Sequence, residues 1–249
     1  MRSTRSRSAL TAACACACAA VALAGCGSAT SNTTASSSAG IGAQPSASSS
    51  VNASGLKCST APGTNANPPQ YSLPSKSVAE GKTFVATVVT NCGDLTFELY
   101  GDKAPQTVAS FLQLAAKYWV NSPCQRLTTA ESGIYVLQCG DPTGTGSGSP
   151  GYGFGIENAP SNGDYPAGTL AMARASSPDS NGGQFFIVYA DTQLPTEGGG
   201  YSIFGKVIGG MNIIDAIAKA GSDNTNGAGD GHPNQPISIL KITVTEKKA

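Results

Sequence analysis

The stretch Asn181-Gly-Gly-Gln184-Phe-Phe186-Ile-Val-Tyr-Ala190 carries the strongest fold signal in this 249-residue chain. From Gln184 onward it is rich in aromatic and β-branched residues, which favour a strand, and a glycine pair precedes it. Side chains two residues apart share a face of a strand, so Gln184 and Phe186 are predicted to point the same way. This strand therefore presents an amide and an aromatic ring on one surface.

Seven further strands and two helices are predicted around this segment. The strands cover roughly 84–90, 95–100, 125–129, 134–138, 168–173, 203–208 and 237–245, and a turn joins the first two in a hairpin. Apolar residues recur at helical spacing from Pro105 to Trp119 and from Met211 to Ala220. Eight strands and two helices in about 165 residues predict an all-β fold, a closed β-barrel with the helices covering its open ends.

Several of these strands carry side chains that would converge on one surface. Val136 and Gln138 share a face, as do Ala173 and Ala175, and Arg126 lies in a neighbouring strand. Together with the strand quoted above, this set holds a cation, two amides and apolar groups, but no evident nucleophile or general base. Taken singly, an Arg in a strand is usually a solvated residue and a Phe usually belongs to the core.

Composition and short motifs exclude other classes of protein. Charged residues make up 12% of the chain and the net charge is zero, which argues against a nucleic-acid partner. The segment 146–151 matches a dinucleotide fingerprint but contains Pro150, and 200–206 resembles a phosphate loop but continues with Val207. His232 is the only His, so we expect neither a hydrolase triad nor a metal site, and no cofactor.

The order of the motifs along the chain is specific. They are Pro105-x-Thr-Val-x-x-Phe-x-x-Leu, Gln125-Arg126-Leu127, 138–146 (Gln-Cys-Gly-Asp-Pro-Thr-Gly-Thr-Gly), 170–175, 181–187 and 204–207. In this order they resemble the cyclophilin family of peptidyl-prolyl cis-trans isomerases, over roughly Lys82 to Lys247. The resemblance implies an eight-stranded antiparallel β-barrel capped by two α-helices, and proline-containing polypeptides as substrates. We expect a monomer, although no feature of the sequence indicates an oligomeric state.

The resemblance also implies a role for each residue of the predicted site. Arg126 is the catalytic residue that donates toward the prolyl nitrogen, and Gln138 orients it. The substrate-binding residues, which line the proline pocket or flank it, are Tyr135, Val136, Ala173, Arg174, Ala175, Gln184, Phe186, Leu194 and Tyr201.

The chain departs from the family pattern at several of these positions. Gln125 replaces the usual His before the catalytic Arg, and Arg174 replaces an Asn. Tyr135 and Val136 stand where a Phe and a Met usually line the pocket, and Tyr201 where a His is usual. Leu194 aligns with the Trp that contacts cyclosporin, which predicts weak binding of that drug. The alternative interpretation is therefore a cyclophilin-like module that binds proline segments with little or no turnover.

The N-terminus is predicted to be an export signal. Arg2, Arg5 and Arg7 precede an uncharged, mostly apolar run that is too short to span a membrane. The run ends in Leu23-Ala24-Gly25-Cys26, which resembles a bacterial lipobox with Cys26 as the lipidated residue. We expect an exported protein, lipid-anchored to the cell membrane on its extracytoplasmic face; an ordinary secretory signal or an anchor helix is the alternative.

The predicted organisation is a signal peptide at 1–25, a flexible Ser-, Ala-, Thr- and Pro-rich tether at 26–81 and the barrel domain at 82–249. The Pro-rich end of the tether, 56–77, is predicted to be extended and to lie against the domain. Four cysteines follow Cys26, and an exported protein retains disulfides. Of the three possible pairings we favour Cys124 with Cys139, on neighbouring strands, which leaves Cys58 with Cys92.

Overall fold

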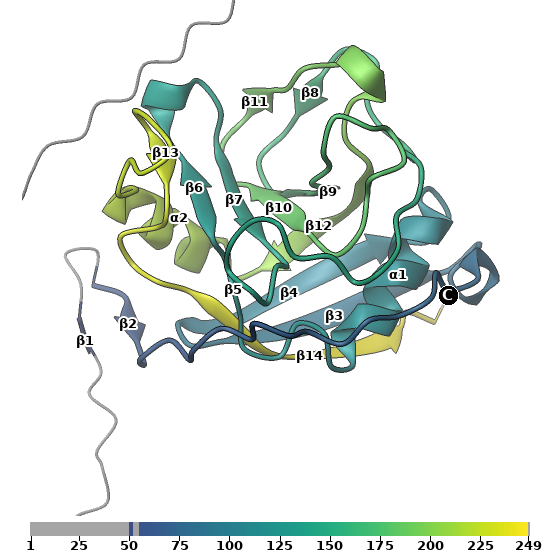
Figure 1. Ribbon diagram of the computed structural model, residues 1–249, viewed down its shortest axis with the longest axis horizontal. Helices are drawn as coiled ribbons and strands as arrows, with labels where there is room; N and C mark the ends of the chain where they lie inside the picture. Colours follow the sequence, from purple (N-terminus) through teal and green to yellow (C-terminus); the bar gives the residue numbers. More distant parts are fainter. Residues whose placement is uncertain (1–49, 52–54, 249) are drawn as a thin grey trace, which may run out of the picture. The chain divides into compact units, whose positions relative to one another are not determined.

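A ten-stranded antiparallel sheet forms the framework of the protein. The computed structural model describes residues 50–51 and 55–248 (Figure 1). The strand order in the sheet is β13-β6-β7-β10-β9-β12-β4-β3-β14-β5. The strands are β3 (Thr83–Thr90), β4 (Gly93–Tyr100), β5 (Ser122–Pro123), β6 (Arg126–Thr128), β7 (Val136–Cys139), β9 (Thr169–Met172), β10 (Phe185–Val188), β12 (Ile203–Gly209), β13 (Asp230–Gly231) and β14 (Ser238–Glu246).

The sheet closes into a barrel through a bend between β5 and β6. β5 pairs with β14 and β6 pairs with β7, although only Cys124 and Gln125 separate β5 from β6 in the chain. The backbone N–H of Cys124 also donates to the Ile237 carbonyl at 2.9 Å. With β5 and β6 counted as one bent strand, all eight predicted strands are present among the described residues. The expected antiparallel barrel is confirmed.

Short elements complete the described part of the chain. Two two-stranded ribbons pair β1 (Ser50–Val51) with β2 (Lys57–Cys58), and β8 (Asp164–Tyr165) with β11 (Thr192–Gln193). Three 3-10 turns are η1 (Lys76–Val78), η2 (Ala130–Ser132) and η3 (Glu197–Gly199).

The two helices add apolar side chains to the barrel core. α2 (Met211–Ala220) matches its predicted bounds and buries Ile213, Ile214 and Ile217. α1 (Pro105–Ala115) ends before Trp119, so the predicted helix was too long. The Trp119 indole instead packs on Phe111 and donates to two backbone carbonyls, which requires the chain to leave the helix.

The first turn of α1 is capped by a residue from a distant loop. No side chain of the preceding residue caps the helix. The Glu157 carboxylate instead accepts hydrogen bonds from the backbone N–H groups of Gln106 and Thr107, at 3.0 and 2.8 Å. This contact satisfies free N–H groups and places negative charge at the positive end of the helix dipole.

The segment from Leu56 to Pro74, hereafter the arm, packs against the domain (dark blue in Figure 1). Its extended course along the domain is the one expected from its prolines. A disulfide joins Cys58 to Cys92, and Gln113 of α1 donates to the Ser72 carbonyl at 3.0 Å. The arm, which the sequence predicts to lie against the domain, therefore does so, and the packed part of the chain includes residues upstream of Lys82.

The second disulfide joins Cys124 to Cys139, so both favoured pairings are found. The predicted signal peptide, the lipidation residue Cys26 and the first part of the tether lie outside the described residues. In the part of the chain that the structure describes, no helix has the length and apolar character needed to cross a bilayer.

Replacing both Cys124 and Cys139 by Ala is expected to lower the free energy of unfolding by about 3 kcal/mol. The bond closes a 15-residue separation, and its loss restores that much chain entropy to the unfolded state. Urea unfolding of the oxidised proteins at pH 7 measures the change. An unaltered unfolding midpoint in the double variant would show that the bond does not restrain the unfolded chain.

Candidate active site

The predicted catalytic residues lie opposite each other on neighbouring strands. Arg126 of β6 is in register with Gln138 of β7. The same row continues across the sheet, because Gln138 is in register with Phe186 of β10, and Phe186 with Ala171 of β9. Residues in register on adjacent strands present their side chains on one face. The row therefore leads from a cation through an amide to an apolar surface.

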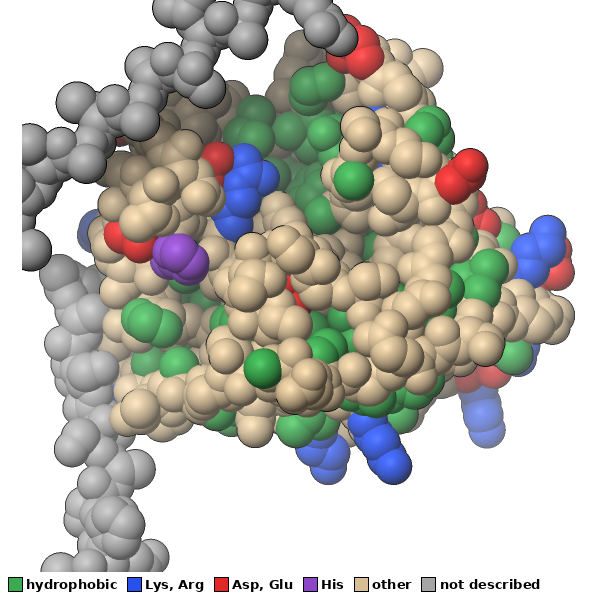
Figure 2. Space-filling view, viewed as in Figure 1, with side chains coloured by type: hydrophobic (Ala, Val, Ile, Leu, Met, Phe, Trp, Pro, Cys, Tyr) green, Lys and Arg blue, Asp and Glu red, His purple; other side chains and the backbone are tan. Residues whose placement is uncertain are grey.

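That apolar surface is a second cluster on the outer face of the barrel, hereafter the outer cluster. Along β10, Phe185 and Ile187 belong to the barrel core, whereas Phe186 and Val188 point outward. The cluster consists of Val136, Tyr165, Ala171, Phe186, Val188 and Leu194, with Ile134, Ala173, Tyr201 and Ile203 packed around it. In Figure 2 hydrophobic side chains gather in a hollow of the surface, with a basic side chain at its edge.

Arg126 is held by a carboxylate on its other side. Its Nε donates to Asp230 Oδ1 at 2.8 Å and its Nη2 to Asp230 Oδ2 at 2.6 Å, in the two-pronged geometry typical of Arg–carboxylate pairs. Its Nη1 donates to Gln138 Oε1 at 3.3 Å. Asp230 belongs to β13, which pairs with β6. The guanidinium is thus oriented from both neighbouring strands.

The charges of this pair reinforce each other. The hydrogen bonds from Arg126 hold the pKa of the Asp230 carboxyl below its ordinary value, against an opposing effect of burial, and Asn226 assists. The same contact raises the pKa of Arg126. The guanidinium therefore stays protonated throughout the pH range in which the protein can work.

Three glutamine side chains extend the network away from the Arg. Gln184 Oε1 accepts hydrogen bonds from Gln138 Nε2 at 2.9 Å and from Gln125 Nε2 at 2.8 Å. Gln184 Nε2 in turn donates to the carbonyls of Gly146 and Gly148. Gln125, which replaces the family His, is buried and serves as a support for Gln184.

A groove adjoins this network. It has a volume of about 700 Å³, and its walls include Gln138, Gln184, the loop 146–153 and the segment 173–175. Ala173 and Ala175 therefore border the groove. Their backbone N–H groups already donate within the protein, to the Gln184 carbonyl and to Ser180 Oγ.

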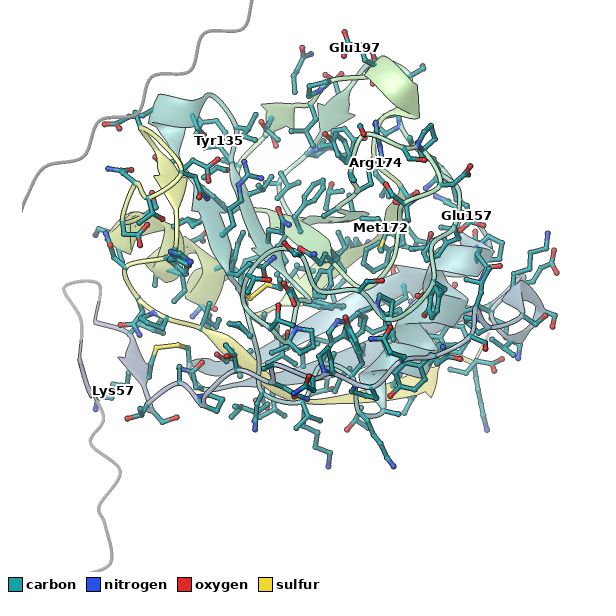
Figure 3. The ribbon with its side chains drawn as sticks, in the orientation of Figure 1. Lys57, Tyr135, Glu157, Met172, Arg174 and Glu197 are labelled. Carbon is teal, nitrogen blue, oxygen red and sulfur yellow. A yellow bond between two sulfur atoms is a disulfide. The ribbon has the colours of Figure 1, made fainter. Side chains whose placement is uncertain are left out.

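The Arg174 side chain is turned toward a different loop, at 197–201. Its guanidinium donates to the carbonyls of Gly200 at 2.8 Å and Glu197 at 2.9 Å, and lies 5.0 Å from the ring centre of Tyr201 (Figure 3). Tyr201 packs edge-to-face on Phe186, with ring centres 5.7 Å apart. Arg174 thus holds the loop that carries Tyr201 against the outer cluster.

Tyr135 and Leu194 differ from their expected surroundings. Val136 points into the outer cluster, so the preceding Tyr135 is directed away from it, and its ring packs on Tyr189 at 5.8 Å between centres. Leu194 lies within the outer cluster and is only 8% exposed. It therefore forms part of the cluster itself and is not an exposed contact residue of the kind its alignment with the family Trp suggests.

Sequence reasoning missed several residues of the site. Asp230 lies in a polar loop whose pattern gives no strand signal, and only the pairing of β13 with β6 brings it to Arg126. Tyr165 enters the outer cluster from a two-residue strand, and its hydroxyl donates to the Tyr201 carbonyl at 2.9 Å. A signal for Tyr165 existed in its aromatic side chain, but neither residue has a spacing that links it to the site.

The fold and the site together define a small antiparallel barrel with a cation and an apolar cluster on its outer wall. Residues 85–244 match the family model described as cyclophilin type peptidyl-prolyl cis-trans isomerase/CLD. The chain belongs to this family.

Individual relatives agree with the family assignment. "Probable peptidyl-prolyl cis-trans isomerase B" of Mycobacterium tuberculosis is 40% identical over 169 residues, which cover 63% of this chain and 53% of that protein. "Peptidyl-prolyl cis-trans isomerase A" of the same species is 36% identical over 178 residues, 66% of this chain and 93% of that protein. The chain spans about half the length of the first of these relatives.

Solved structures are similar as well. The crystal structure of a Cryptosporidium parvum cyclophilin type peptidyl-prolyl cis-trans isomerase matches with a TM-score of 0.55 and 34% identity, covering 67% of this chain and 99% of the other. A structure of the same protein in the presence of the dipeptide Ala-Pro matches with a TM-score of 0.55 and 36% identity, covering 66% and 99%.

The Arg126–Asp230 pair is expected to make stability depend on pH. The pKa of Asp230 is lower in the folded protein than in the unfolded chain. The stability that the ion pair contributes is therefore fully present above the unfolded pKa of ~3.9, and it is lost as the pH falls through the folded pKa. Asp230→Asn should therefore be less stable than the unmutated protein at pH 7, and the difference should shrink below about pH 4.

Urea unfolding at a series of pH values measures this difference. Arg126→Gln and the double variant Arg126→Gln/Asp230→Asn supply the matched controls of a double-mutant cycle. The quantity compared is the change in free energy of unfolding caused by Asp230→Asn. If this change is the same at pH 7 and at acid pH, or is the same in the Arg126→Gln background, the Arg126–Asp230 pair is not the cause of the pH dependence.

Proposed function

We propose that the chain catalyses cis-trans isomerisation of X-Pro bonds in exported or envelope proteins. Rotation about such a bond crosses a barrier of ~18–20 kcal/mol and takes tens to hundreds of seconds unaided. No covalent bond is made or broken, so a catalyst needs only to bind the twisted transition state more tightly than the planar amide. A site without a nucleophile or a general base is sufficient for this chemistry.

The observation that carries the proposal is the Arg126–Gln138 pair beside the outer cluster. In this proposal the outer cluster receives the proline ring, and an N–H of Arg126 donates to the prolyl nitrogen. That bond draws the nitrogen lone pair out of amide resonance, which lowers the barrier to rotation. The Gln138 bond and the Asp230 bonds hold the guanidinium in advance, so the donor need not reorganise during the reaction.

The residues around the pocket would position the substrate. Phe186 is the proposed base of the proline pocket and Tyr201 its rim, since their rings pack edge-to-face. The groove bordered by Gln184, Ala173 and Ala175 would take the extended chain next to the proline. The similar structure determined in the presence of Ala-Pro supports a proline-containing ligand for this family.

A second candidate function is a binding module that holds proline segments with little turnover. The contacts of Arg126 favour it, because Asp230 accepts from both Nε and Nη2 and so neutralises much of the charge that catalysis would use. Measuring exchange and binding on the same peptide separates the two candidates.

Arg126→Ala is expected to lower kcat/KM for exchange in a short X-Pro peptide about 100-fold, the size of effect found when one transition-state donor is removed. NMR exchange spectroscopy or a coupled assay measures the rate, with Lys219→Ala, an exposed cation on α2, as the matched control. If the unmutated protein binds the peptide without accelerating exchange, the binding module is the correct function.

We also propose that Cys26 anchors the protein to the membrane through a lipid. The support is the lipobox-like tetrapeptide that ends the apolar run. When the full chain is expressed in a bacterium fed a clickable fatty acid, the unmutated protein should be labelled and Cys26→Ser should not. Cys18→Ser is the matched control and should keep the label. Label that survives in Cys26→Ser would place the anchor elsewhere.

A further inference from the structure

We propose that the arm sets the preference of the site for the residues that flank proline, by bracing the wall of the groove from behind. The proposal rests on the proposed function, since the groove is taken to hold the substrate chain. The wall in question is the loop 141–151, hereafter the groove loop.

The front of the groove loop faces the groove. Residues 146–151 line the cavity of about 700 Å³, and Gly146 and Gly148 accept hydrogen bonds from Gln184 Nε2 at 2.9 and 3.2 Å. Gln184 also binds Gln138, which contacts Arg126. A change in the position of this loop therefore changes the shape of the groove directly at the residues that border the catalytic pair.

The groove loop has little regular structure of its own. It contains no strand or helix, and most of its central residues are exposed. Its internal support is Asp141, which is fully buried and accepts hydrogen bonds from the backbone N–H groups of Thr143 at 2.8 Å and Gly148 at 3.0 Å. A loop with no regular structure and many exposed residues has low local stability, so contacts from other segments contribute strongly to its order.

The arm supplies those contacts at both ends of the loop. The Asn65 N–H donates to the Pro142 carbonyl at 2.8 Å, near the start of the loop. Near its end, the Tyr71 N–H donates to the Pro150 carbonyl at 2.7 Å and Gln70 Nε2 to the Ser149 carbonyl at 3.0 Å.

The middle of the loop also lies close to the arm. Gly144 has a φ of +71°, and a Cβ added there would stand 3.0 Å from the Thr64 methyl group. Any other residue would be strained in this conformation and crowded by the arm. The arm thus follows the back of the groove loop along most of its length.

The arm can act as a brace because other parts of the fold hold it. The Cys58–Cys92 disulfide ties its start to the turn between β3 and β4. Gln113 of α1 donates to the Ser72 carbonyl at 3.0 Å, and the ring of Tyr71 packs edge-to-face on Tyr118. The arm precedes residue 85, where the match to the family model begins. The arm therefore lies outside the matched residues and still reaches the wall of the groove.

Full-length Gln70→Ala/Tyr71→Ala tests the proposal, because it removes the Gln70 bond to the groove loop and the ring that seats the arm. Gln106→Ala is the matched control, since it removes an arm contact to α1 and leaves the groove loop untouched. The substrates are tetrapeptides that differ only in the residue before proline, Ala or Phe. The measurement is kcat/KM for exchange, together with hydrogen exchange of the Gly148 and Gly151 amides.

We expect the Phe-to-Ala ratio of kcat/KM to change at least threefold in the double variant and to stay constant in Gln106→Ala. Amide exchange at Gly148 should be at least tenfold faster in the double variant only. The proposal is wrong if the double variant lowers kcat/KM for both peptides by one common factor. It is also wrong if the double variant leaves both the ratio of kcat/KM and the amide exchange unchanged.

Failure of the proposed function gives a different result. If the unmutated protein accelerates neither peptide, the enzyme proposal fails, and the brace is judged by amide exchange and by the ratio of the two peptide dissociation constants. If the double variant changes neither this ratio nor the amide exchange, the proposal that the arm braces the groove loop is wrong as well.

Discussion

The register between β6 and β7 is the constraint on which the site depends. Closing the barrel requires the chain to bend between β5 and β6, so that one segment pairs with β14 and then with β7. The Cys124–Cys139 disulfide links the bend between β5 and β6 to β7, beside Arg126 and Gln138. A shift of one residue would turn Arg126 to the opposite face of the sheet and break its alignment with Gln138. The same pairing of β6 with β7 therefore closes the barrel and places Arg126 beside Gln138.

The strands of the barrel carry two apolar surfaces with different tasks. Leu137, Phe185 and Ile187 face the core, where close packing stabilises the fold. Val136 and Phe186 face the outer cluster, to which Tyr165 of β8 and the loop residues Leu194 and Tyr201 also contribute. Strict alternation along short strands therefore lets one sheet supply both a core and a ligand surface.

The strand and helix pattern could be predicted because it is local. β-Branched and aromatic residues marked the first two strands, and short apolar stretches bounded by Gly or Pro marked the other six. The apolar stripe of α2 with Gly221 after it marked that helix. The group Arg126, Gln138, Gln184 and Phe186 was also recognisable, since period-two spacing assigns faces and the family motifs assign order. The end of α1 was missed because Trp119 continues the helical spacing while its indole is needed by two carbonyls elsewhere in the fold.

By itself, the sequence determined the strands, the faces of their side chains and the family. These properties depend on neighbours within a few residues or on motif order. Only the tertiary structure decided that Asp230 holds Arg126 across a separation of 104 residues, that Arg174 is directed to the loop that carries Tyr201, and that the arm lies behind the groove loop. Hydrogen bonds of this kind join polar groups from distant segments, and no periodicity records which partner a side chain will meet once the barrel has closed.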